Sequence, residues 1–368
     1  MESFLKTERL LESGPFEFTT ESRGLFLESF REMASHHFDA SPEFRSFWNQ
    51  IGLTPQDIES EEDLVRAPAM MVTLFKEWDL CSVSRQDIVL RLTSSGTGGQ
   101  KSQMLLNEGS LRRVKKMAWN IHKALGITSS DKVNYVCFTY DPRVAKDLGT
   151  AFTDELLTSF TGIQSVYYAF QWNTQKNEFE FNEQGLIQRL RECQKEGLPV
   201  RLLGFPAFIY KVIKENNLQF NFGAHSWVQT GGGWKGLADQ EIPKVEFRQY
   251  ISEKLGVPIS NIRDLLGMVE HGIPYVDCER GNLHVPNYAR VFVRSPFDLK
   301  PLANGEQGLL QLLCTYNDSY PAMNILTTDW GRLGRCDCSL GGATIQITGR
   351  AGVSKHKGCA IQALEDFK

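Results

Sequence analysis

A glycine-rich segment, TSSGTGGQKS, begins at Thr93 between the apolar run IVLRL, which predicts a buried strand, and the run NEGSLRRVKKMAW, which predicts a helix. Glycines let successive backbone N–H groups turn toward an anion, and hydroxyl side chains add further donors. A lysine at the rim adds a positive charge. Two interpretations stay open, a phosphate-binding loop and a turn between two strands. The segment is not a Walker loop, because Gln100 rather than glycine precedes the lysine. The candidate phosphate ligands are Thr93, Ser94, Ser95, Gly96, Thr97, Gly98, Gly99 and Lys101.

Two pairs of soft metal ligands lie about fifty residues apart. Cys278 and His284 form a C-x5-H pair, and Cys336 and Cys338 form a C-x-C pair. Three thiolates and one imidazole are a common ligand set for structural zinc, and four protein ligands leave no open position for catalysis. The alternative is that the cysteines pack in a strand pair, where C-x-C directs both side chains to one face.

The C-terminal tail, SKHKGCAIQ, contains a candidate nucleophile. Cys359 lies within four residues of Lys355, His356 and Lys357. Nearby positive charge lowers the pKa of a thiol and raises its thiolate fraction. His356 could instead act as the base that removes the thiol proton. The alternative for Cys359 is a small buried side chain, which is common for free cysteine.

Composition narrows the class of protein. The 368 residues carry a net charge of −4 and are 41% hydrophobic, so a basic nucleic-acid-binding face is not expected. The N-terminus lacks the basic start and apolar core of a signal peptide, and no apolar run is long enough for a membrane span. We therefore expect a cytoplasmic protein whose eight cysteines are reduced.

Short apolar runs alternate with helix-length patterns from about residue 86. Runs such as VNYVCFTY, VRLLGF and WVQTGG predict strands, and NEGSLRRVKKMAW and PAFIYKVIKENN predict helices. This alternation predicts an α/β fold with a largely parallel sheet. We expect a mainly helical region at 1–85, a core at 86–349 that becomes β-rich from about 275, and a short tail at 350–368. Within the first region, His36 and His37 are expected on a solvated helix face.

Three segments resemble, in order, motifs of adenylate-forming enzymes. TSSGTGGQKS resembles their phosphate loop, although Gly98 replaces a hydroxyl residue and no proline precedes Lys101. QTGGGWKG (229–236) resembles the segment that lines the adenine pocket. LLGMVEHG (265–272) resembles a segment whose glutamate is kept as Glu270, while leucine and valine replace its aromatic residue and its threonine.

Two further segments complete the family order. TTDWGRLG (327–334) and ITGRAG (347–352) resemble the two segments whose acidic and basic residues contact the ribose, here Asp329 and Arg350. Such enzymes use ATP to convert a carboxylate into an acyl-adenylate, with release of pyrophosphate. The resemblance implies that the loop and Lys101 hold the phosphates and that Glu270 binds Mg²⁺. The residues it implies at the adenine are Gly231, Gly232, Gly233, Gly267 and Met268.

The segment after Arg350 narrows the resemblance, because only 18 residues follow where the ligases carry a small domain with a catalytic lysine. The tail, with VTLFKEWDL, TGGGWKG and KGCA, resembles the acyl-protein synthetases of luminescent bacteria (LuxE type), related to phenylacetate-type ligases. That family implies activation of a fatty acid, transfer of the acyl group to Cys359, and delivery to a partner such as an acyl reductase. The alternatives are an acyl- or aryl-CoA ligase and a non-catalytic nucleotide-binding scaffold.

Overall fold

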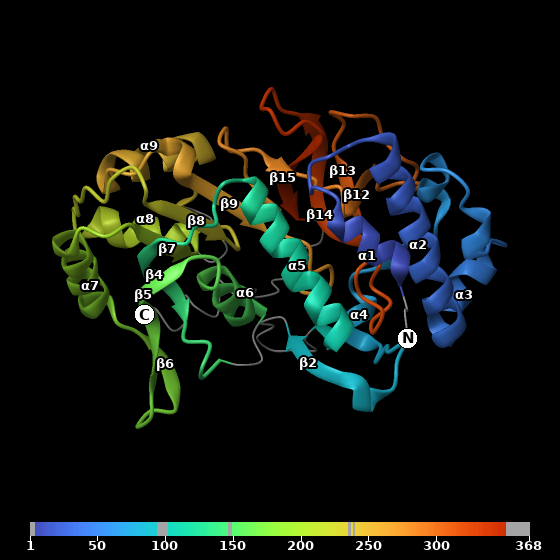
Figure 1. Ribbon diagram of the computed structural model, residues 1–368, viewed down its shortest axis with the longest axis horizontal. Helices are drawn as coiled ribbons and strands as arrows, with labels where there is room; N and C mark the ends of the chain where they lie inside the picture. The colour runs from blue at the N-terminus through green and yellow to red at the C-terminus, as the bar shows by residue number, and fades with distance from the viewer. Residues whose placement is uncertain (1–3, 94–101, 146–148, 235–236, 238–239, 351–368) are drawn as a thin grey trace.

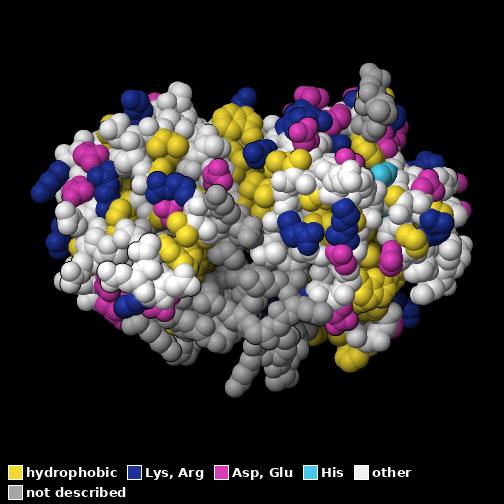
Figure 2. Space-filling view, turned by 90° about the horizontal axis from the view of Figure 1, so that it is seen from below, with side chains coloured by type: hydrophobic (Ala, Val, Ile, Leu, Met, Phe, Trp, Pro, Cys, Tyr) yellow, Lys and Arg dark blue, Asp and Glu magenta, His cyan; other side chains and the backbone are white. Residues whose placement is uncertain are grey.

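The computed structural model describes residues 4–93, 102–145, 149–234, 237 and 240–350. Two large sheets lie side by side in Figure 1. The green and yellow one is accompanied by α7, α8 and α9, and the orange and red one by the blue N-terminal helices. Helix α5 (Glu108–Ala124) runs between these two parts. On the face in Figure 2, acidic and basic side chains are interspersed.

The first sheet has seven strands in the order β10-β9-β8-β7-β4-β5-β6. The five central strands are parallel, and only the two edge strands are antiparallel. The two strands at its middle, β4 and β7, are almost entirely buried because helices cover them, which explains their mostly apolar sequence. The strands are β4 (Lys132–Tyr140), β5 (Gly162–Asn173), β6 (Glu178–Phe181), β7 (Val200–Gly204), β8 (Trp227–Gly231), β9 (Ile262–Leu266) and β10 (Tyr275–Val276). The helices are α6 (Gly149–Thr158), α7 (Glu183–Glu196), α8 (Pro206–Glu215) and α9 (Lys244–Leu255).

The second sheet is antiparallel in the order β11-β15-β14-β13-β12, and the short β1 adds a parallel pairing to β14. The predicted α/β class, with a mostly parallel core and a β-rich part, is confirmed. None of the described helices combines the length and apolar character needed to cross a membrane. The strands are β1 (Met70–Met71), β11 (Leu283–His284), β12 (Ala289–Arg294), β13 (Gly308–Cys314), β14 (Asn324–Arg335) and β15 (Ala343–Arg350).

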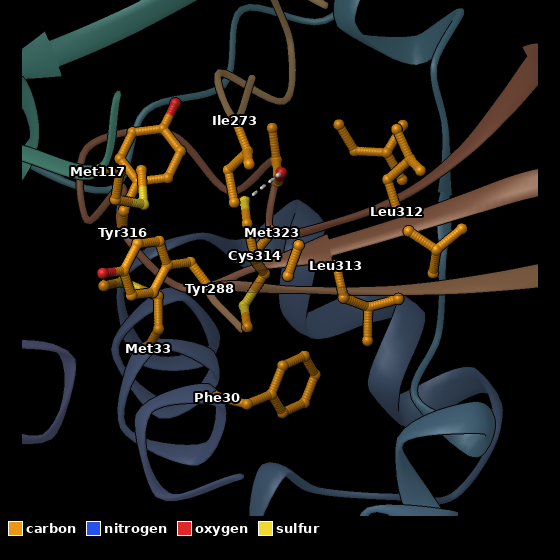
Figure 3. Close-up of a cluster of buried hydrophobic side chains, with 14 of the residues drawn as sticks. Phe30, Met33, Met117, Ile273, Tyr288, Leu312, Leu313, Cys314, Tyr316 and Met323 are labelled. Carbon is orange, nitrogen blue, oxygen red and sulfur yellow. Dashed lines mark hydrogen bonds between the residues drawn. The ribbon is translucent and has the colours of Figure 1, made fainter. Parts of the chain in front are cut away.

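The N-terminal helices pack on the antiparallel sheet. Figure 3 shows Phe30 and Met33 of α2 close to Leu313 and Cys314 of β13, with Met117 of α5 alongside. The helical spacing of the apolar residues in α2 predicts one buried face, and the structure shows these residues buried along one side of the helix. The helices are α1 (Leu5–Glu12), α2 (Thr20–Ala40), α3 (Pro42–Gln50) and α4 (Leu74–Glu77), with short 3₁₀ turns at Pro55–Asp57 and Glu62–Arg66.

The prediction for His37 is wrong. Its side chain is fully buried, and its ring nitrogens lie 2.7 Å from Ser82 Oγ and 2.9 Å from the Asn317 carbonyl oxygen. Burial lowers the pKa of His37 to about 3, so this imidazole is neutral. It joins α2 to two segments that are distant in sequence and has a structural role.

The glycine segment is flanked by two strands rather than by a strand and a helix. β2 (Ile88–Thr93) pairs antiparallel with β3 (Gln103–Asn107), and α5 begins directly afterwards, where Asn107 accepts a hydrogen bond from Ser110 N. The expected buried strand at β2 is also wrong, because its residues alternate and Val89 is 51% exposed. Residues 94–101 of the loop itself lie outside the described part of the chain.

Candidate active site and metal centre

A cavity of about 250 Å³ lies at the carboxyl ends of the parallel strands. Ligands bind at this edge in open α/β sheets, because the strands diverge there into loops. Four of the residues predicted at the adenine line its wall, whereas Gly233 does not; the four are Gly231, Gly232, Gly267 and Met268. The rest of the wall is mainly apolar and comes from β2, β3, α5, β4, α6, β7, β8 and β9 and from the segments that follow β7 and β9.

Close approach explains the glycines after β8. Gly232 has a φ of +77°, and a Cβ there would lie 2.7 Å from the ring of Phe205, another residue of the cavity wall. A Cβ on Gly231 would lie 3.2 Å from the Leu265 carbonyl oxygen. The chain before them is fixed by Thr230, whose hydroxyl donates to Asp264 Oδ1 at 2.9 Å. Any larger residue at Gly232 would therefore narrow the cavity.

Three segments meet where the glycine loop begins. A Cβ on Gly149, the first residue of α6, would lie 2.8 Å from Val269 and 3.7 Å from the Thr93 carbonyl oxygen. The N-terminal end of α6 thus lies next to both the start of the glycine loop and the segment that contains Glu270. Such a helix end favours an anion. The other predicted loop residues, Ser94 to Lys101, are outside the described residues.

Glu270 lies in a tight turn between β9 and β10 and is 9% exposed. The N–H groups of His271 and Gly272 donate to the Met268 carbonyl oxygen at 3.1 and 2.8 Å. His271 stacks on Tyr275, and its Nε2 lies 2.7 Å from the phenol oxygen. Burial lowers the pKa of His271 to about 3, so it is neutral. Glu270 itself does not line the cavity, although the preceding residue, Val269, does. The Glu270 carboxylate is a hard oxygen ligand of the kind that suits Mg²⁺.

Asp329 and Arg350 face each other across strands β14 and β15. They are direct partners in the strand register, and Arg350 Nε donates to Asp329 Oδ1 at 2.9 Å. The backbone N–H of Asp329 donates to Thr327 Oγ1 at 3.1 Å, which anchors the acidic residue. The structure therefore brings the two predicted ribose residues together, but it does not place either of them on the cavity wall.

The two pairs of soft ligands converge. The ligand atoms of Cys278, His284, Cys336 and Cys338 lie within 4.8 Å of one another. The Sγ atoms of Cys278 and Cys336 are 3.8 Å apart, and Cys338 Sγ is 3.2 Å from His284 Nε2. Two sulfurs bound to one tetrahedral zinc at about 2.3 Å would be about 3.8 Å apart. The set therefore fits zinc in both ligand type and spacing.

The surroundings of the cluster orient its ligands. His284 Nδ1 lies 3.0 Å from the Gly341 carbonyl oxygen, so it carries the proton and leaves Nε2 free to coordinate. Gly281, with a φ of +80°, closes the turn between the first two ligands, and its N–H donates to the Cys278 carbonyl oxygen at 2.9 Å. A side chain at Gly281 would collide with the Arg248 guanidinium. The turn is thus specific for glycine.

The cavity wall also contains a histidine that we did not predict, His122, which pairs with Gln229. His122 Nδ1 donates to the Ala118 carbonyl oxygen at 2.7 Å, and Nε2 accepts from the Gln229 amide at 2.9 Å. Burial lowers the pKa of His122 to about 4, which keeps it uncharged. Thr139 and Asp154 also line the wall. Asp154 lies on the buried face of α6 with Leu157 and Thr158, at the i, i+3, i+4 spacing of one helix face, but a single carboxylate in that pattern does not by itself indicate a site.

Comparison with known proteins agrees with this geometry. The sequence model of the acyl-protein synthetase family, LuxE, matches residues 3–368. Two long-chain-fatty-acid–luciferin-component ligases are similar, from Aliivibrio fischeri (25% identical over 90% of this chain and 85% of the relative) and Vibrio harveyi (26% identical, with the same coverage).

Solved structures of 2-hydroxyisobutyryl-CoA ligase are similar in fold. An open conformation superposes with a TM-score of 0.69 over 90% of this chain and 70% of that one, and a postadenylation state with 0.70 over 95% and 73%; both are 17% identical. The fold is therefore that of the adenylate-forming ligases, and the chain belongs to the LuxE family of acyl-protein synthetases.

Proposed function

We propose that this protein activates a fatty or related carboxylic acid with ATP and transfers the acyl group, through a cysteine of its own, to a partner protein. The observation that carries the proposal is the cavity at the carboxyl ends of the parallel strands, with Gly231, Gly232, Gly267 and Met268 on its wall. Membership of the LuxE family supports acyl activation. The relatives are named for a long-chain fatty acid and a luciferin component. The acyl reductase as acceptor rests on the resemblance of the tail to the acyl-protein synthetases of luminescent bacteria.

In the first step a carboxylate oxygen attacks the α-phosphorus of ATP. A bond forms between that carboxylate oxygen and the α-phosphorus. The bond from the α-phosphorus to the oxygen that bridges to the β-phosphate breaks, and pyrophosphate leaves. The work of the site is positioning and charge stabilisation. The glycine loop and Lys101 would hold the phosphates, and Asp329 and Arg350 would hold the ribose. Glu270 would bind Mg²⁺, which supplies positive charge to the phosphate oxygens.

In the second step the Cys359 thiolate attacks the acyl carbonyl. A carbon–sulfur bond forms, the carbon–oxygen bond to phosphorus breaks, and AMP leaves with that oxygen. The thiol proton goes to His356 or to solvent, with the tail lysines favouring the thiolate. Cys359 and His356 lie outside the described residues, so this step rests on the tail sequence and the family. A nucleophile of the partner then takes the acyl group.

The cluster of three cysteines and His284 would hold a structural zinc ion. With all four positions taken by protein, the ion would supply cross-linking and no chemistry. The zinc ion would join the turn that follows β10 to the segment that precedes β15. Strand β15 ends at Arg350.

Acid-dependent exchange of pyrophosphate into ATP tests the proposal. We expect exchange with fatty acids in the wild type and a fall of about 100-fold or more in Glu270→Gln, because the amide keeps the shape but loses the charge that binds Mg²⁺. A CoA arm tests the ligase alternative, which predicts acyl-CoA release that saturates with CoA. Nucleotide binding without exchange for any fatty or aryl acid would contradict the proposal and favour a scaffold.

A further inference from the structure

Two polar groups on the cavity wall lack hydrogen-bond partners. Asp154, on α6, is 7% exposed, and Thr139, near the end of β4, is 3% exposed. Asp154 Oδ2 and Thr139 Oγ1 make no hydrogen bond of normal geometry to any residue that the structure describes. Asp154 also has no ion pair among these residues, and burial raises its pKa to about 7, an effect that the nearby Thr139 hydroxyl only partly offsets.

The other polar side chains of the wall are satisfied. His122 and Gln229 bond to each other, Thr230 donates to Asp264, and the Thr153 hydroxyl donates to the Gly149 carbonyl oxygen at 2.9 Å. Buried polar groups almost always have partners, so the two that remain are an exception to be explained. Because they come from adjoining elements, α6 and β4, and face the same cavity, one ligand group can reach both.

An unsubstituted fatty chain would leave these groups unsatisfied. The surrounding wall is hydrocarbon, including Leu106, Phe152, Leu203 and Phe205, and methylene groups offer no hydrogen bond. A leucine in place of Asp154 would suit such a chain better. A polar substituent on the acyl chain at that position would supply the missing partner.

We propose that the acid activated by this protein carries a hydroxyl group on its acyl chain, and that Asp154 and Thr139 bind this hydroxyl. The inference rests on the proposed function and narrows its substrate class to hydroxy-substituted acids. A hydroxyl can donate to the carboxyl and accept from Thr139, or the reverse, so it is satisfied in either protonation state of Asp154. An ammonium substituent would require an ionised carboxylate in an apolar wall, which is less favourable.

Matched acids in the pyrophosphate exchange assay test this inference. Acids of equal chain length would carry no substituent, a hydroxyl at C2, at C3 or at the terminal carbon, or an amino group at the same positions. We expect kcat/KM for one hydroxy acid to exceed that of its unsubstituted counterpart by about tenfold or more, since a site built to bind a hydroxyl discriminates against analogues that lack it. In Asp154→Leu this preference should fall below about twofold, because use of the hydroxy acid falls more than use of the unsubstituted acid.

Two controls separate specificity from folding. Asp154→Asn, which still offers hydrogen bonds, should keep part of the preference. Asp154→Leu should unfold at the wild-type temperature or above, because it removes an unsatisfied buried group. Equal use of unsubstituted acids by the wild type, a preference for amino acids, or an equal loss with every acid in Asp154→Leu would overturn the inference while exchange itself upholds the proposed function. No exchange with any acid would overturn both.

Discussion

Replacing Cys359 with alanine is expected to abolish the covalent acyl-protein while acid-dependent pyrophosphate exchange stays within about twofold of the wild type. Adenylation takes place at the cavity, whereas storage of the acyl group needs the thiol, so the two half reactions should separate. With labelled fatty acid, ATP and Mg²⁺, label bound to the protein should fall by about two orders of magnitude or more, measured by intact-protein mass spectrometry and by release with neutral hydroxylamine.

A matched variant excludes a general effect of losing a thiol. Cys81 is only partly buried and donates to the Val83 carbonyl oxygen at 3.2 Å, well apart in sequence from the tail. Cys81→Ala should label as the wild type does. Undiminished labelling of Cys359→Ala would show that another residue holds the acyl group and would refute the role given to the tail.

Loss of zinc is expected to have the second-largest effect. Cys336→Ser should hold less than one tenth of the wild-type zinc, and the free energy of unfolding should fall by about 3 kcal/mol or more, because metal binding free energy contributes directly to folding. Exchange activity should fall as well, since the cluster lies before the strand that carries Arg350. Elemental analysis and calorimetry measure the two quantities.

Cys81→Ser is the control for the zinc experiment and should keep one zinc per chain and the wild-type unfolding temperature. If the wild type, produced with zinc in the medium, contains no metal, or if Cys336→Ser unfolds at the wild-type temperature, the four residues are packing residues instead. That was the alternative for the C-x-C pair.

Patterns that are local in sequence predicted much of the fold. VRLLGF and WVQTGG are mostly buried strands, as short runs that end at glycines predict, and α2 has one apolar stripe. The sequence did not predict β3, because its last residue, Asn107, is also the N-cap of α5. No turn therefore separates this five-residue strand from the helix. The burial of His37 depends on Ser82 and Asn317, which only the folded chain brings to it.

The site was predictable where chemistry and spacing are both local. The two ligand pairs were visible as pairs, but their convergence follows from the antiparallel pairing of β11 with β15, which matches Leu283 with Ile345. Asp154 shows the opposite case. One carboxylate among the apolar residues of a helix carries little information until α6 packs on β4 and removes water from it.

The fate of the carboxylate oxygen tests the central claim most directly. The protein would turn over ATP and Mg²⁺ with a fatty acid labelled with ¹⁸O in both carboxyl oxygens, chosen as the acid that supports the fastest exchange. Attack of the acid on the α-phosphorus, followed by loss of AMP from the acyl carbon, predicts one ¹⁸O atom in each AMP produced. Unlabelled AMP, or ADP with the label in inorganic phosphate, would contradict activation through an acyl-adenylate.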